Sequence, residues 1–358
     1  MLASPPFSYL ETLNVVDDAI DKNAELSLAI LQTALQSFGI PNLSGTPDEQ
    51  NPNDWRGKAT SNDLEKARST IRQFYRDWSS DGFSEREACY GPVIRALLAE
   101  RKSRPGSSMR VLVPGAGLGR LVFDLCCEGF NTEGNEISYH QLLASSYILN
   151  HCPAPQAHTI YPWAHSFSNH KSRANHLKSI QVPDLHPGMT LGSTEHAGEM
   201  SMSASDFLLL YGDQEHKDTF DAVATVFFLD TAPNIIRYIE AIHSCLRKGG
   251  LLVNMGPLLW HFENNAPGTH GREAEPGAED GKGESPKFSN WKLPLTGTPG
   301  IADPGAVELT DDEVVVLVGK LGFDIENRES GLSAPYIQDP TSMLQNTYKA
   351  SHWVARKR

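Results

Sequence analysis

The sequence predicts an α/β protein built on a doubly wound, Rossmann-like sheet, and two observations support this fold class. Met109–Val113 is a short apolar run typical of a buried parallel strand, glycines follow it, and Leu121–Leu125 then has helical spacing. Downstream, further apolar runs alternate with helical patterns. Such alternation places helices on both faces of a mostly parallel sheet.

The remaining elements of the sheet domain continue this alternation. A second strand is expected to end near Asn135-Glu136. After it we expect a helix over 142–149, a strand within 220–229, a helix over 235–246, a strand over 251–254, a helix over 312–321 and closing strands at 322–325 and 352–355.

Helical spacing dominates the first hundred residues. Apolar positions recur at helical intervals over 9–38, and two further helices are expected over 63–78 and 90–101. Either Asn62 or Asp63 is a suitable N-cap for the second of these helices, because both side chains can accept a hydrogen bond from the first helical N–H groups.

These elements predict a two-part organisation. Residues 1–104 are expected to form a helical N-terminal cap that contributes to a cofactor site, and residues 105–358 a Rossmann-like domain. Insertions are expected within that domain at about 151–200 and 264–290, where the composition turns to Pro, Ser and Asn or to Gly, Glu and Pro.

Composition excludes several classes of protein. A net charge of −13 and a pI near 5.4 argue against a nonspecific nucleic-acid binder, which needs a basic surface. No run of eighteen apolar residues suggests a membrane span, and the first twenty residues lack the pattern of a signal peptide. We therefore expect a cytosolic or nuclear protein with small or cationic partners.

Cysteine and histidine usage gives no metal-binding pattern. The five cysteines are scattered and odd in number, which fits a reducing compartment without disulfides. Seven of the thirteen histidines lie in 151–200, but they never adopt the HxxxH or HxH spacing of metal ligands. We expect no metal site.

A candidate nucleotide site begins at the glycine loop. Glycines at 115, 117 and 119 let backbone N–H groups approach a ligand where the strand turns into the helix. Glu136, at the end of the next strand, can accept protons from ribose hydroxyls, an arrangement that also suits NAD. Asp206-Phe207 favours a different nucleoside site, because the acid can accept an adenine amino proton while the ring packs on adenine.

This order of glycine loop, ribose acid and adenine acid resembles the class I methyltransferase plan, and longer motifs narrow the resemblance. Together they resemble the carnosine N-methyltransferase family and cover most of the chain from about residue 63 onward. The matching stretches are Gln73–Ser79, Val113–Leu121, Gly134–Glu136, Tyr161–Trp163, Phe167–Asn169, Phe227–Ala232, Gly256–Glu263, Glu329-Ser330 and Tyr348.

The resemblance implies an S-adenosylmethionine-dependent enzyme that methylates an imidazole nitrogen of carnosine, giving anserine, with a homodimeric tendency. It implies cofactor contacts from Gln73 and Arg76, at the amino-acid end of the cofactor, and from Gly115, Gly117, Glu136, Asp206 and Phe207. It places Asp230, His261 and Tyr348 around the acceptor imidazole, with Asp230 and His261 as the catalytic pair.

Alternatives remain at this point. A histidine within a protein or peptide could replace the dipeptide as acceptor, the fold could bind S-adenosylmethionine without catalysis, or the chain could be an NAD-dependent oxidoreductase. Without the resemblance, Asp230 equally suits a helix cap and His261 a packed side chain. Val226 and the length of 264–290 depart from the family pattern, which leaves the substrate range open.

Overall fold

The computed structural model describes residues 1–43, 45–48, 50–51, 54–104, 106, 108–263 and 307–358. Its centre is a seven-stranded sheet in the order β5-β2-β1-β6-β7-β9-β8, in which the first five strands run parallel and β9 runs antiparallel to both of its neighbours, β7 and β8. The strands are β1 (Arg110–Pro114), β2 (Asn131–Glu136), β5 (Met200–Ala204), β6 (Phe220–Val226), β7 (Leu246–Gly256), β8 (Phe323–Pro335) and β9 (Thr347–Lys357).

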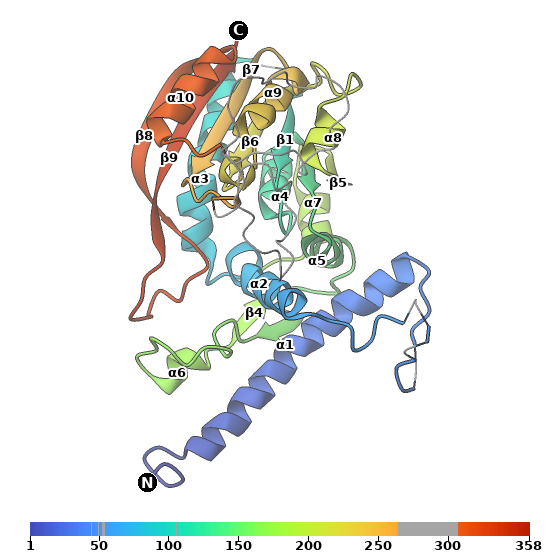
Figure 1. The fold of residues 1–358 in the computed structure, drawn as a ribbon. Coiled ribbons are helices and arrows are strands. Elements are labelled where there is room, and N and C mark those ends of the chain that lie inside the picture. The colour runs from blue at the N-terminus through green and yellow to red at the C-terminus, as the bar shows by residue number, and fades with distance from the viewer. Residues whose placement is uncertain (44, 49, 52–53, 105, 107, 264–306) are drawn as a thin grey trace, which may run out of the picture.

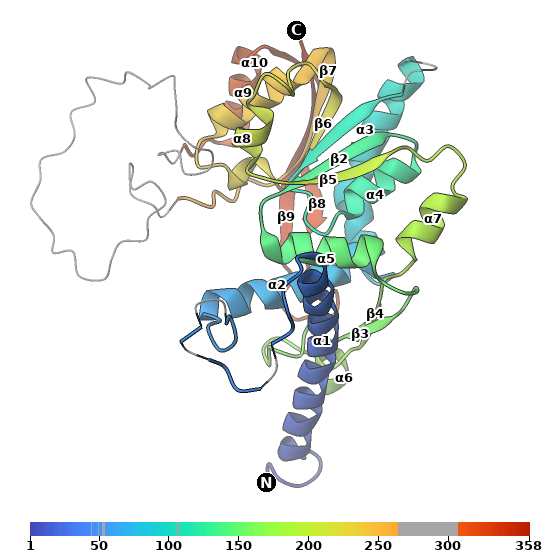
Figure 2. The same ribbon diagram turned by 90° about the vertical axis from the view of Figure 1, so that its right-hand side faces the viewer.

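Helices cover both faces of this sheet, so the predicted doubly wound fold class is confirmed (Figure 2). The helices of one face are α8 (Phe207–Tyr211), α9 (Ile235–Cys245) and α10 (Asp311–Lys320), and those of the other are α3 (Phe83–Ser103) and α4 (Arg120–Cys127). Because strand side chains alternate, Leu112 of β1 packs on the first group while Val111 and Val113 pack on the second.

A third core lies below the carboxyl ends of the strands. It joins α1 (Tyr9–Ser37), α2 (Ser61–Trp78) and α5 (Tyr139–Asn150) to the small antiparallel pair β3 (His158–Ile160) and β4 (Ile180–Val182). The start of α1 extends away from the sheet (Figure 1), and no helix among the described residues is long and apolar enough to cross a membrane.

The local expectations for the N-terminal helices need three corrections. Thr60 is the N-cap of α2, and Asp63 is the third helical residue that completes a capping box, because the two side chains exchange hydrogen bonds with each other's backbone N–H. The helix expected over 90–101 begins at Phe83 and continues through Pro92. It also packs on the sheet, so residues before 104 share the core of the sheet domain.

The closing strands are longer than expected, and the insertion at 151–200 is structured. β8 and β9 form a twisted hairpin of 13 and 11 residues, of which only short apolar segments were predicted from sequence. The insertion contains β3 and β4, with two short helices, α6 (Arg173–His176) and α7 (Pro187–Ser193). The expected insertion at 264–290 lies outside the described residues.

Candidate active site

The strand order reverses between β1 and β6, and a cavity of about 350 Å³ lies at the carboxyl ends of these strands. Open α/β sheets bind their ligands at such a reversal, because the loops diverge there and leave a crevice. Five residues singled out in the sequence line the cavity: Gly115, Glu136, Asp206, Phe207 and His261.

The glycine loop forms the wall of this cavity after β1. Gly115, Gly117 and Gly119 all have positive φ, between 57° and 77°, a conformation that L side chains rarely adopt. A Cβ atom on Gly115 would also lie only 2.8 Å from the Phe228 ring. Glycine is therefore required at this position both by the backbone and by the close approach of the ring.

Glu136 is held in place by three backbone N–H groups. One carboxylate oxygen accepts from Gly117 at 2.9 Å, and the other accepts from Ile137 at 2.9 Å and Ser138 at 2.8 Å. The side chain is buried at the cavity wall. A carboxylate has about four acceptor positions, so three fixed bonds orient it and leave capacity for a ligand hydroxyl.

Asp206 and Phe207 begin helix α8 at the opposite wall. Asp206 is the N-cap of α8 and accepts a hydrogen bond from the Leu208 N–H at 2.8 Å, so it has a structural role as well as a place in the cavity lining. Phe207 is buried and packs edge to face against Phe228 and Tyr238, with ring centroids 5.3 and 5.4 Å apart. These rings form an apolar surface suited to a purine.

Helix α2 brings Gln73 and Arg76 beside the cavity. Trp78 Nε1 donates to the Leu118 carbonyl at 3.0 Å, which fixes the helix to the glycine loop. Gln73 Oε1 accepts from Gln141 Nε2 at 3.0 Å, and Gln141 lines the cavity. Gln73 and Arg76 themselves, like Gly117 and Asp230, are not among the residues that line it.

Asp230 follows β6 and is joined to His261 through the backbone. It is buried, its Oδ2 accepts from the Leu259 N–H at 2.9 Å, and its backbone carbonyl accepts from the His261 N–H at 3.1 Å. Burial raises the pKa of this carboxyl. Asn234 caps α9, so Asp230 is not the cap of that helix.

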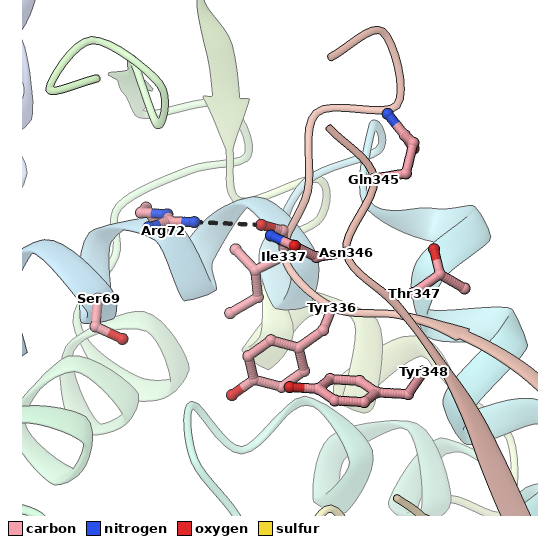
Figure 3. A pocket seen from close by; sticks show the side chains of 8 residues that line it. All are labelled: Ser69, Arg72, Tyr336, Ile337, Gln345, Asn346, Thr347 and Tyr348. Atoms are coloured by element: carbon pink, nitrogen blue, oxygen red, sulfur yellow. Dashed lines mark hydrogen bonds between the residues drawn. The ribbon is translucent and has the colours of Figure 1, made fainter. Parts of the chain in front are cut away.

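Tyr348 lies next to this cavity, on β9. Its ring centroid is 6.0 Å from those of Phe227 and Tyr336. Both of those residues line the cavity of about 350 Å³ described above, which we call the inner cavity. Tyr348 itself lines a neighbouring outer cavity of about 520 Å³ (Figure 3). Tyr336 lines both cavities and forms the wall between them.

Ten cavity residues were not predicted from sequence as site residues, among them Gln141, Phe228, Tyr238 and Tyr336. Phe228 belongs to a recognised motif, and Tyr238 follows the helical spacing of α9, so both carried some sequence signal. Tyr336 carried no sequence signal, since it lies in the loop between β8 and β9. Among the described residues, no group of three His, Cys, Asp or Glu could hold a metal ion.

Comparison with known proteins decides the family. The model of the family described as carnosine N-methyltransferase matches residues 53–358. A carnosine N-methyltransferase of Schizosaccharomyces pombe is 34% identical over 98% of this chain and 83% of its own length. That of Rattus norvegicus is 31% identical over 96% and 75%. The chain belongs to the carnosine N-methyltransferase family.

The family match contains every predicted site residue, from Gln73 to Tyr348, whereas α1 precedes it. Among solved structures, magnesium protoporphyrin IX methyltransferase from Synechocystis aligns with a TM-score of 0.38 at 11% identity, covering 81% of this chain and 97% of that one. The predicted class I methyltransferase fold is confirmed by the family and by the sheet order together.

Proposed function

We propose that this protein is an S-adenosylmethionine-dependent N-methyltransferase that methylates an imidazole nitrogen of carnosine, giving anserine. Family membership supports the substrate. The structural observation that carries the proposal is the position of Asp230, a buried carboxyl directly behind the cavity that suits a nucleoside: Asp230 does not line this cavity itself, but its backbone carbonyl accepts from the N–H of His261, which does. An imidazole has one N–H and one lone pair, so a fixed acceptor on one side defines which nitrogen reacts.

The residues of the inner cavity fit S-adenosylmethionine. Its adenine would pack against Phe207, its ribose would bind Glu136, and its amino-acid end would lie toward Gln73 and Arg76. The close approach of Phe228 to Gly115 leaves no room for a side chain in the loop that would cradle it. The bound cofactor supplies a methyl group carried on a sulfonium.

Asp230 is assigned the orienting role. Its carboxylate accepts the imidazole N–H, directs the opposite nitrogen toward the methyl group, and stabilises the positive charge that develops on the ring during transfer. With the cofactor bound, the new N–C bond would form as the S–C bond breaks, and the ring N–H proton would then be released to solvent. His261 orients the acceptor or relays this proton, and Tyr348 hydrogen-bonds the substrate.

One observation favours a second acceptor, a histidine within a protein or peptide. His261 is exposed at the rim of the cavity, so a ring presented on a larger surface could approach it. This acceptor would use the same Asp230 and the same cofactor site. The two candidates differ only in what surrounds the imidazole.

An assay with labelled S-adenosylmethionine separates these acceptors. Purified protein is incubated with carnosine or with a cell extract, and small molecules are separated from protein. Label in methylcarnosine supports the proposal, and label only in protein histidine replaces it with the alternative. Cofactor binding without any transfer would indicate a non-catalytic binding module.

The oligomeric state is a further part of the proposal. We propose a homodimer, and the exposed apolar residues Leu2, Phe7, Leu10 and Leu13 around the start of α1 support it, because water-exposed apolar clusters favour association. Light scattering of wild type and a Leu10→Glu variant tests this; a monomeric wild type contradicts it.

We also propose a cytosolic or nuclear location. The five cysteines are free thiols, four of them buried, which agrees with a reducing compartment. Microscopy of a fluorescent fusion tests this location, and a signal confined to a secretory compartment contradicts it.

A further inference from the structure

The outer cavity next to Tyr348 contains a positively charged side chain, and the proposed reaction assigns it no role. Arg72 of α2 is the one charged residue among the described side chains that line it, and the others are Ser, Asn, Gln, Thr, Tyr and Ile (Figure 3). A cavity with a single guanidinium and no acidic lining residue favours an anionic group. We propose that Arg72 binds the free carboxylate of the dipeptide acceptor and so determines specificity for it; this rests on the proposed function.

The arginines of α2 differ in their partners. Arg68, Arg72 and Arg76 are four residues apart and therefore lie on one helix face. Arg68 pairs with Glu65 at 2.6 Å and Arg76 with Asp77 at 2.7 Å. Among the described residues, Arg72 has no carboxylate partner.

Local contacts hold the Arg72 side chain at the cavity. One of its nitrogens donates to the Ile337 carbonyl at 3.5 Å, a long hydrogen bond, and its guanidinium lies 5.8 Å from the Trp163 ring centroid. A guanidinium has five N–H donors in a planar fork, so a single bond to Ile337 leaves donors for a carboxylate. The ring contact restricts the side chain without neutralising its charge.

The position of the cavity matches the chemistry of the acceptor. Tyr336 separates it from the inner cavity, and Tyr348, assigned to the imidazole, lines it. In a histidine unit the carboxylate carbon is three bonds from the ring, about 4 Å away. Because Tyr348 and Arg72 line the same outer cavity, an acceptor whose imidazole contacts Tyr348 can extend its carboxylate into that cavity.

The test compares carnosine with β-alanylhistamine, which has the same imidazole and amide but no carboxylate. In Arg72→Gln we expect KM for carnosine to rise about tenfold, the lower end for a hydrogen bond to a charged group, because Arg72 is exposed. The kcat for carnosine and the KM for β-alanylhistamine should stay within about twofold of wild type. Arg72→Lys should recover part of the carnosine affinity.

Arg68→Gln is the matched control, since Arg68 lies one turn away and is already paired; its KM for both substrates should be unchanged. If Arg72→Gln raised the KM for carnosine and the KM for β-alanylhistamine by the same factor, Arg72 would have a structural role and the assignment would be overturned. Unchanged carnosine KM would overturn it as well. Wild type that transfers no methyl group to carnosine would instead refute the proposed function, and the assignment with it.

Discussion

Asp230→Asn removes a charge from the proposed site while keeping the shape of the side chain. Asp230 is 4% exposed, and the Asn oxygen can still accept the hydrogen bond from the Leu259 N–H. What is lost is the anion that stabilises the developing imidazolium. Removing one preorganised electrostatic partner of this kind typically lowers kcat about 100- to 1000-fold, and we expect that loss in the labelled-methyl assay with carnosine.

The same substitution should stabilise the folded chain at neutral pH. Burial raises the pKa of Asp230 above its ordinary value, so the folded state binds this proton more tightly than the unfolded state. The stability from this group is fully present below the unfolded pKa and is lost as pH rises through the folded pKa. Asparagine avoids that loss, and each kcal/mol gained raises Tm by about 1–2 °C for a chain of this length.

Asp221→Asn is the matched control for both readouts. Asp221 is also buried but lies near the beginning of β6, where it accepts from the Arg110 N–H at 2.8 Å and pairs with Arg247 at 3.0 Å. Its replacement should lower Tm and leave kcat near wild type. Equal loss of transfer and of S-adenosylmethionine affinity in Asp230→Asn would refute the role assigned to Asp230.

Three further substitutions test residues that form or support the site. Gly115→Ala should weaken S-adenosylmethionine binding more than tenfold by calorimetry, because of its positive φ and the 2.8 Å contact with Phe228; wild-type affinity would contradict this. Trp78→Phe should lower the free energy of unfolding by about 1–3 kcal/mol in urea titrations, since the buried Leu118 carbonyl loses its donor. Tyr348→Phe should raise KM for carnosine roughly five- to tenfold at similar kcat, and a KM equal to that of wild type would argue against the hydrogen bond.

Short-range patterns predicted much of the sheet. The strand–glycine–helix unit from β1 to α4 was predicted because strand, turn and helix are each encoded by adjacent residues. The same holds for α9, whose apolar spacing is regular. Strand β8 was only partly predicted, because most of its residues up to Ser330 are exposed and carry no apolar alternation.

The nucleoside side of the candidate site was also accessible from sequence. Gly115 and Glu136 each lie at the carboxyl end of a strand, and parallel strands bring those ends to one edge. Asp206 shows the limit of this reasoning, because the same spacing describes a helix cap, and the structure gives it that role as well.

The sequence by itself determined the fold class, the glycine loop and the acid after the second strand, because backbone conformation and strand ends depend on neighbouring residues. Only the tertiary structure decided what surrounds the acceptor. Tyr336 meets Arg76 and Phe227 from distant segments, and Arg72 meets Ile337 across 265 positions of sequence. Contacts at such separations arise from the packing of α2 on the sheet and its closing hairpin, which no local pattern records.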